Sequence, residues 1–257
     1  TSVAIKYYLK KRHTFGKMTM EIQDMEGNKI TEIAPGKSKG INIVRWNYSM
    51  KPPKLAAAKT FAFGGFTSPR AKAGMYKAVM KKGKETYETT FEIKNDPKSF
   101  ITDAERKAQY DTTRKLVNEQ EDLAYMVYEL DEMVKKANSI KESGSKGAKV
   151  AQPLIDELTA LKETLVVTTG DNYVGTAPPQ LREKMSSIYA DVASNFEAPS
   201  KPQLDNIKLL TDRFNKAKED FAKIKSKQYA KLSKYLEKNN LEAVKLKSRD
   251  EFIDAKE

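Results

Sequence analysis

Over the first third of the chain, apolar and polar residues alternate every second position, which is the period of a half-buried β-strand. The segments are rich in β-branched and aromatic residues and are separated by turns that carry Gly, Pro or Asn. In residues 41–47, for example, Ile41, Ile43 and Arg45 lie on one face, and Asn42, Val44 and Trp46 lie on the other. The expected strands are residues 3–9, 17–24, 28–34, 41–47 and the two arms of a hairpin within 74–94. This spacing predicts a sandwich of two antiparallel sheets.

From about residue 98 onward the apolar period becomes that of a helix. Asp96-Pro97 ends the last strand, because the residue before proline is held extended and proline cannot donate to a ladder. Thr102 and Glu105 form a capping box, which opens a helix. Four amphipathic segments come next, and the clearest apolar seam runs through Ile207, Leu210, Phe214, Ala217, Phe221 and Ile224. These segments predict a four-helix up-down bundle.

The two patterns together predict an α+β chain of two domains, with the β-sandwich over residues 1–97 and the bundle over 98–257. The third helix is expected to begin at Pro178-Pro179, because proline suits a first turn, and to carry Phe196 on its apolar face. The tail, residues 241–257, is expected to be either a docked strand or a frayed end.

The connection over residues 47–73 is much longer than the usual connection of about 4–6 residues, and it is apolar. It contains the sequence FAFGGF, in which Phe61, Phe63 and Phe66 argue against disorder. Either these rings cap the sandwich or seal its seam with the bundle, or they dock a partner. In the second interpretation the candidate docking residues are Phe61, Phe63, Phe66 and Arg70.

The charge is unevenly distributed along the 257 residues, whose formal net charge is +12. Residues 1–97 hold 19 Lys and Arg against 8 Asp and Glu, a net charge of +11, whereas residues 98–257 hold 28 against 27. A basic half suggests nucleic acid or an acidic neighbour. The cations are scattered over all the strands and no nucleic-acid motif is present, so we disfavour nucleic acid.

The inventory of catalytic groups is small. The chain has no cysteine, which excludes disulfides, thiol catalysis and Cys-ligated zinc, and its one histidine, His13, lies in a basic turn without metal-ligand partners. The carboxylates of the helical half interleave with lysines on the faces opposite the apolar seams, as on solvated helices. We therefore predict no catalytic residue, no metal and no cofactor. The sequence contains no run of about 18 apolar residues, so we predict no membrane-spanning helix.

The segments AIKYYLKKRHTFGKMTMEIQDMEGNKI, GINIVRWN and AKAGMYKAVM, in this order, resemble a known family region. They are similar to the C-terminal region of bacterial secreted proteins with a BNR/Asp-box repeat β-propeller of the sortilin (Vps10)-like or sialidase-like type. The helical segments EDLAYMVYEL and PPQLREKMSSIYADV resemble the helical part of that same region, so the resemblance covers nearly the whole chain. The positions that match the pattern of its strands are Gly40, Asn42, Val44, Trp46, Gly74 and Tyr76.

This resemblance implies an immunoglobulin-like sandwich and an exported parent, so that the chain would be a periplasmic, cell-surface or secreted fragment. The chain lacks the Asp-box repeats themselves, hence any glycosidase chemistry of a propeller is not expected in it. The prediction is a non-catalytic accessory module that stabilises or docks the upstream β-propeller, with another protein or a glycan as further possible partners. The alternatives are a carbohydrate-binding module and a hydrolase domain that acts on glycans. Trp46 and Tyr76 are expected in the sandwich core, Gly74 in a turn, and Asn42 in hydrogen bonds that hold a loop.

Overall fold

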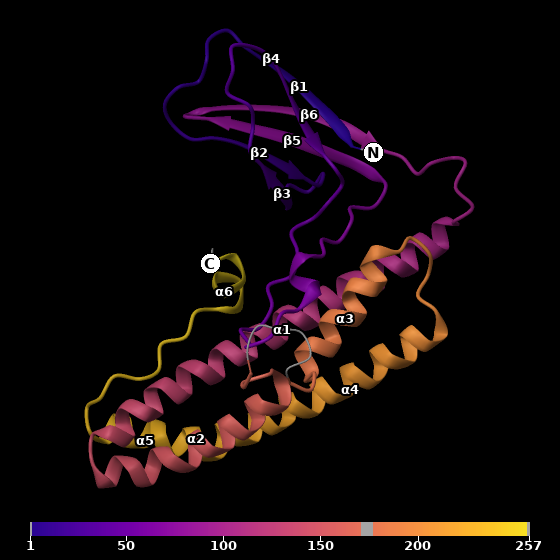
Figure 1. Ribbon diagram of the computed structural model, residues 1–257. Helices are drawn as coiled ribbons and strands as arrows, with labels where there is room; N and C mark the ends of the chain where they lie inside the picture. Colours follow the sequence, from indigo (N-terminus) through magenta and orange to yellow (C-terminus); the bar gives the residue numbers. More distant parts are fainter. Residues whose placement is uncertain (1, 171–176, 256–257) are drawn as a thin grey trace. The chain divides into compact units, whose positions relative to one another are not determined.

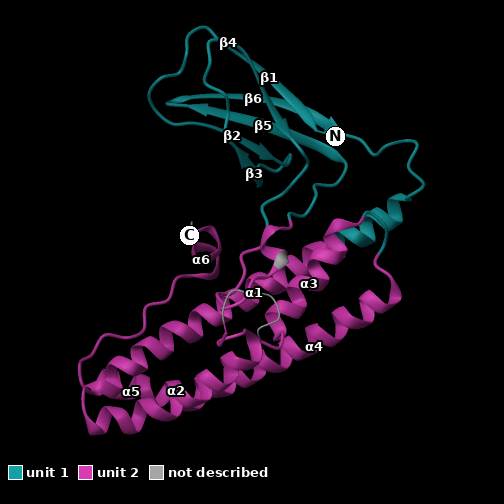
Figure 2. Ribbon diagram, viewed as in Figure 1, with its two compact units in different colours: residues 1–52, 68–111, 196–198 teal, residues 53–67, 112–195, 199–257 magenta. Residues whose placement is uncertain are grey.

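The computed structural model describes residues 2–170 and 177–255, with the side chain of Phe63 left out (Figure 1). It is an α+β structure with two antiparallel sheets and a set of helices. The chain divides into two compact units (Figure 2). The strand unit comprises residues 1–52, 68–111 and 196–198, and the helical unit comprises residues 53–67, 112–195 and 199–257. Residues 53–67, expected within the sandwich, thus belong to the helical unit.

The strand unit contains the six strands that the alternation predicts, each within one or two residues of its expected bounds. One sheet pairs β1 with β4, and the other has the order β3-β2-β5-β6. Turns join β2 to β3 and β5 to β6, and Gly27 and Gly83 adopt positive φ angles there, as tight hairpin turns require. The strands are β1 (Val3–Leu9), β2 (Met18–Gln23), β3 (Lys29–Ile33), β4 (Gly40–Trp46), β5 (Gly74–Lys82) and β6 (Glu85–Ile93).

The two sheets share one hydrophobic core, because each contributes every second side chain to it. Along β4 the predicted faces are confirmed, since Asn42, Val44 and Trp46 are buried and the residues between them are exposed. The Trp46 ring lies 5.5 Å from the Tyr76 ring in an edge arrangement, as expected for the centre of the core. The core residues are Ile5, Leu9, Met18, Met20, Ile22, Val44, Trp46, Tyr76, Ala78 and Met80.

The helical unit is built from long amphipathic helices whose apolar faces meet in a second core. The predicted capping boxes of the first and fourth helices are present, at Thr102–Glu105 and Ser200–Gln203. All six residues of the predicted seam of the fourth helix are buried. The helices are α1 (Asp103–Glu142), α2 (Ser145–Leu165), α3 (Leu181–Ser194), α4 (Lys201–Ile224), α5 (Ala230–Lys238) and α6 (Arg249–Asp254), and a π-helical turn, η2 (Lys225–Tyr229), joins α4 to α5.

The π-helical turn changes the spacing of the buried face. Along α4 the buried residues succeed one another at steps of three and four, the last being Ile224. The next fully buried residue of this rod is Leu232, in α5, and Leu236 comes after it. That step of eight is one residue longer than two steps of the seam, and the wider turn accommodates the extra residue.

The predicted ends of the third helix are wrong. Helix α3 begins at Leu181, where Gln180 and Glu183 form its capping box, so Pro178-Pro179 precede the cap. It ends at Ser194, because Asn195 is extended, and the Ser194 hydroxyl and the Asn195 side-chain amide donate to carbonyls of the last turn. Phe196 therefore lies outside the helix, half exposed, and belongs to the strand unit.

The tail is neither a strand nor a frayed end over its described residues, because its last part forms α6 and docks on α1. Arg249 donates from Nε to the Asp122 carboxylate at 2.7 Å. The Phe252 ring stacks on the Tyr128 ring, with 4.7 Å between centroids. Ser248 caps α6 with Glu251 at its third position. The short helix is thus stabilised by its contacts and its cap rather than by its length.

Replacing Phe214 by Ala should destabilise the helical unit by about 3–5 kcal/mol, because the side chain is fully buried and its removal leaves a cavity. Urea unfolding followed by helical circular dichroism measures this free energy. Leu209→Ala in the same helix is the matched control, since Leu209 is exposed, and it should cost less than about 1 kcal/mol. Equal losses in the two variants would contradict the buried position of Phe214.

Tyr76 should make the strand unit lose stability at alkaline pH. Burial raises the pKa of Tyr76 to about 12, above the value of 10.0 for an unperturbed tyrosine. The folded state therefore disfavours ionisation, so this stability is complete below pH 10 and falls as the pH rises toward 12. Tyr76→Phe removes this contribution, and its urea midpoint should decline less over that pH range than that of the parent protein. Parallel declines in both proteins would contradict the assignment.

Candidate functional site

Residues 53–67, which we call the aromatic loop, are anchored to the helical unit along their whole length. At one end, the Lys54 ammonium donates to the carbonyls of Phe252 and Ala255, at 3.0 Å each. In the middle, the Lys59 N–H donates to the Val167 carbonyl at 2.9 Å. Ala56 is buried in the helical core. The backbone of this long connection is therefore fixed, although it contains only one short 3₁₀ turn, η1 (Phe63–Phe66).

Gly64, the first glycine of the Gly-Gly pair, allows the loop to approach α3 closely. The Gly64 N–H donates to the Ser186 hydroxyl at 2.7 Å, and this hydrogen bond is buried. A Cβ on residue 64 would lie 2.5 Å from Ser186 Oγ and 3.1 Å from the Tyr189 ring. Only glycine fits at such a distance, because real Cβ atoms do not come so near a side chain held by its helix. This contact gives a physical reason for the glycine in the FGGF sequence.

Helix α3 also holds both ends of the segment from residue 60 to 67. The Tyr189 hydroxyl donates to the Thr67 carbonyl at 2.7 Å, and burial raises the pKa of Tyr189, which keeps the donor protonated. Arg182 donates to the Thr60 carbonyl at 3.1 Å. Glu183 accepts from the Thr60 hydroxyl at 2.9 Å and from Arg182 at 2.8 Å. These groups replace the strand or helix partners that an isolated loop lacks.

Two of the predicted docking residues lie together on this anchored backbone. The rings of Phe61 and Phe66 stack almost in parallel, with 5.1 Å between centroids and 8° between planes. Phe61 is 53% exposed and Phe66 is 73% exposed. The side chain of Phe63 falls outside the described part of the structure. The aromatic loop therefore presents a stacked apolar pair to solvent, which we call the Phe61–Phe66 pair.

The fourth predicted docking residue, Arg70, belongs to the strand unit. Its guanidinium lies over the Phe196 ring, 4.1 Å from the centroid, and the residue forms an isolated antiparallel bridge with Ser49. It is exposed, and its role as a partner contact stays a prediction.

The residues that match the strand pattern of the family all belong to the strand unit, where their contacts stabilise the fold. The Trp46 indole donates to the Ser49 carbonyl at 2.9 Å, and the Tyr76 hydroxyl donates to the Lys72 carbonyl, just before β5, at 2.8 Å. The buried Asn42 side chain donates to the Ser38 and Gly40 carbonyls and so holds the loop before β4. Gly40 and Gly74 both have positive φ angles, at the first residues of β4 and β5.

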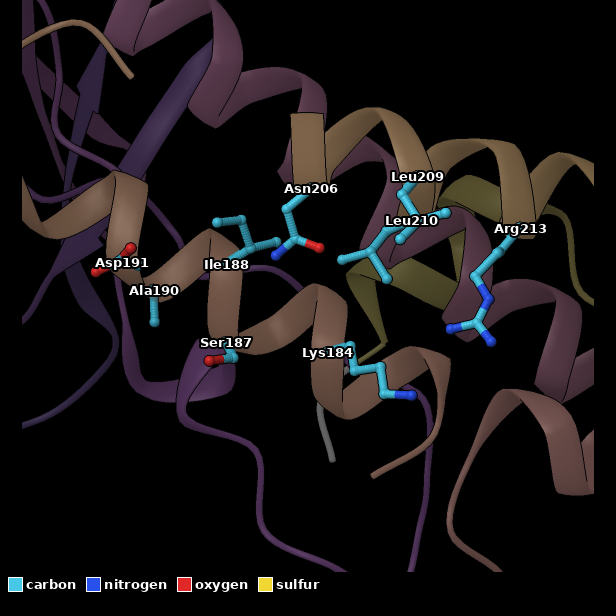
Figure 3. A pocket seen from close by; sticks show the side chains of 9 residues that line it. All are labelled: Lys184, Ser187, Ile188, Ala190, Asp191, Asn206, Leu209, Leu210 and Arg213. Carbon is cyan, nitrogen blue, oxygen red and sulfur yellow. The ribbon is translucent and has the colours of Figure 1, made fainter. Parts of the chain in front are cut away.

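An open groove of about 650 Å³ runs between α3 and α4 (Figure 3). Lys184 and Arg213 lie toward one end and Asp191 toward the other, while Ile188 and Leu210 form apolar walls. Asp191 is the one carboxylate among the residues that line it, and it accepts from Gln203 at 2.9 Å. A glycosidase uses a pair of carboxylates, which these lining residues do not provide.

The remaining chemistry of the described residues is sparse. In residues 2–170 and 177–255, no group of three His, Cys, Asp or Glu is placed to hold a metal ion. None of the buried polar side chains in the same ranges is a carboxylate. Across the part of the chain that the structure describes, no helix combines the length and apolarity needed to cross a bilayer.

Comparison of the chain with protein-family models, with curated proteins and with solved structures found no match in any of the three. The resemblance to the C-terminal region of propeller proteins therefore stays a prediction.

The anchors of the aromatic loop were not predicted from the sequence. Arg182, Ser186, Tyr189 and Ala193 form a second buried face on α3, beside the apolar face that the periodicity indicates. A signal was present, because Arg182 and Ser186 repeat at the spacing of one helix face within an otherwise apolar pattern. Polar residues at buried positions need partners, and here the loop backbone accepts from Arg182 Nη1 and donates to the Ser186 hydroxyl.

Gly64→Ala should displace the aromatic loop from α3 and cost about 1–3 kcal/mol, because the new methyl group overlaps Ser186 Oγ. The melting temperature and amide hydrogen exchange over residues 59–67 would measure both effects. Amide exchange should accelerate at residue 64 of the variant, because the backbone N–H at that position loses the Ser186 hydroxyl as its acceptor.

Gly65→Ala is the matched control for this variant. Its Cβ would meet the flexible end of the Leu55 side chain at 3.1 Å, which can move, and the loss should stay within about 1 kcal/mol. If Gly64→Ala melted and exchanged like the parent protein, the close approach to Ser186 would be refuted.

Proposed function

We propose that this chain is a non-catalytic interaction module that docks the β-propeller of a larger exported protein. The observation that supports the proposal is the Phe61–Phe66 pair. Its rings remain exposed although eight residues of backbone around them, from Thr60 to Thr67, are fixed by hydrogen bonds to α3. The proposal assigns the strand unit to an immunoglobulin-like sandwich and the helical unit to a bundle with four main helices.

The physical reason is preorganisation. A loop that is ordered before binding loses little conformational entropy when a partner covers it. Aromatic side chains that become fully buried supply much of the binding free energy of an interface, and a pair at the centre of a patch acts as a hot spot. In the isolated chain the exposed pair leaves apolar surface in contact with water, which is unfavourable. A partner that covers the two rings would bury this surface.

The partner and the location come from the family resemblance and are part of this proposal. The upstream propeller of the same parent is the first partner, and the parent would be periplasmic, cell-surface or secreted. A glycan is the second candidate ligand, since the outer faces of exposed rings also stack on sugars. Trp46, the residue that a sugar-stacking role would first suggest, is fully buried.

The double variant Phe61→Ser, Phe66→Ser tests the proposal. Its affinity for the parent's propeller, produced separately and measured by calorimetry, should fall at least about 10-fold, as expected when hot-spot rings are truncated. The melting temperature should stay within the range typical of surface substitutions, because neither ring is buried.

Phe100→Ser is the control, since Phe100 is fully exposed and lies in the strand unit. Its affinity for the propeller should equal that of the parent chain. Unchanged binding by the double variant, a collapsed fold, or a natural gene product without a propeller would overturn the proposal. If the double variant lost the parent chain's binding to a glycan array but kept its binding to the propeller, the carbohydrate-binding alternative would be favoured.

A further inference from the structure

The outer face of the β1–β4 sheet combines exposed cations with exposed apolar side chains and has no carboxylate of its own. The register places Tyr8 opposite Ile41, Lys6 opposite Ile43, and Ala4 opposite Arg45. All of these residues are exposed. Neither residues 1–20 nor residues 33–84 contain an Asp or Glu, so the two strands and the loops on either side of them carry positive charge alone.

Two basic loops meet at one end of this sheet, after β1 and before β4 (Figure 1). The backbone N–H of His13 donates to the Lys37 carbonyl at 2.9 Å. The Tyr7 hydroxyl, in β1, donates to the Gly36 carbonyl at 2.5 Å. The backbones of the two loops are therefore held side by side. Together they carry six exposed cations that form no ion pair within the described residues, namely Lys10, Lys11, Arg12, Lys17, Lys37 and Lys39. We call them the basic cluster.

A phenylalanine projects from the same loop. The His13 ring is hydrogen-bonded to the Gly16 carbonyl at 3.2 Å, which closes a tight turn, and Gly16 has a φ angle of 91°. Phe15, inside this turn, is 87% exposed. Ile41, the second residue of β4, is 74% exposed. The basic cluster therefore lies within a surface that also presents an aromatic ring and an aliphatic side chain to solvent.

We propose that this surface, formed by the basic cluster with Tyr8, Phe15, Ile41 and Ile43, binds the surface of an anionic lipid bilayer. Lys and Arg side chains near such a surface each add to the attraction by the negative headgroups. Aromatic and aliphatic side chains enter the boundary between headgroups and acyl chains. Both halves of the surface, the charged and the apolar, then have a matching partner.

The apolar side chains distinguish a bilayer from polyanions that are dissolved in water. A nucleic acid or an acidic polysaccharide satisfies the lysines by releasing counterions, and nucleic-acid bases can stack on Tyr8 or Phe15. Neither offers an aliphatic environment for Ile41 and Ile43, which would stay in water. Self-association through the sheet edge is opposed by Lys6, which lies in the middle of β1 and repels its own copy.

Co-sedimentation of the chain with phosphatidylcholine vesicles, prepared with and without phosphatidylglycerol, tests the proposal. Binding is expected only to the vesicles that contain phosphatidylglycerol, and it should weaken as salt is added. The triple variant Lys10→Gln, Lys11→Gln, Arg12→Gln should lower the partition coefficient about 100-fold, as the loss of three cations near the surface predicts.

The matched control removes the same charge elsewhere. Lys227→Gln, Lys234→Gln, Lys238→Gln changes three exposed lysines of the helical unit and should leave vesicle binding within about 3-fold of the parent. Both triple variants should keep the parent's melting temperature, since the substituted side chains are exposed. Equal losses in the two variants would reduce the effect to net charge and overturn the proposal.

The apolar half has its own variant. Phe15→Ser with Ile41→Ser, which leaves every charge in place, should lower the partition coefficient at least about 10-fold. If this variant binds vesicles like the parent, or if the parent binds DNA or heparin at physiological salt but not the phosphatidylglycerol vesicles, the surface is one for soluble polyanions and the proposal fails. Loss of propeller binding by the Phe61–Phe66 variant would not affect either result, because that variant changes other residues.

Discussion

The backbone contact between Gly64 and Ser186 is the constraint on which the arrangement of the aromatic loop depends. A 15-residue connection from Pro53 to Thr67 would ordinarily be costly to order, because each fixed residue loses backbone entropy. The absence of a side chain at residue 64 lets the loop come within hydrogen-bond distance of α3, and the hydroxyls and the guanidinium of that helix then bind the loop backbone. The loop thereby becomes a part of the helical unit.

This arrangement separates two tasks that a loop sequence usually combines. Backbone groups and small residues face the helices and fix the conformation, so the large side chains of Phe61 and Phe66 are not required for the fold. The strand unit divides its tasks in a similar way, since alternation sends Val44 and Trp46 inward and leaves Ile41 and Ile43 outside. In both units these exposed apolar side chains lie outside the hydrophobic core, so the packing of the core does not depend on them.

The sequence predicted the elements that depend on local periodicity, and it failed where a distant partner decides. Strand alternation and the seam through Phe214 are repeated signals, so strand positions and buried faces were correct. The attachment of residues 53–67 depends on Ser186 and Tyr189, more than 100 residues away, and no local pattern reports that distance. Helix α6 is short and gains its stability from Asp122, Tyr125 and Tyr128, which explains why the tail could not be predicted. Of the candidate site, the exposed phenylalanines were found from the sequence and their anchors were not.

The π-helical turn between α4 and α5 bears on how this chain tolerates changes of length. Such a turn is what an α-helix becomes when one residue is inserted and the flanking turns keep their partners. Because Ile224 and Leu232 stay buried on either side of it, the surplus residue is absorbed locally and the rest of the rod keeps its phase. A relative one residue shorter at Lys225–Tyr229 would form an uninterrupted α-helix with the same leucines in its core. A one-residue alignment gap at this position would therefore indicate a local change in helical winding, and the packing of α4 and α5 on either side would be preserved.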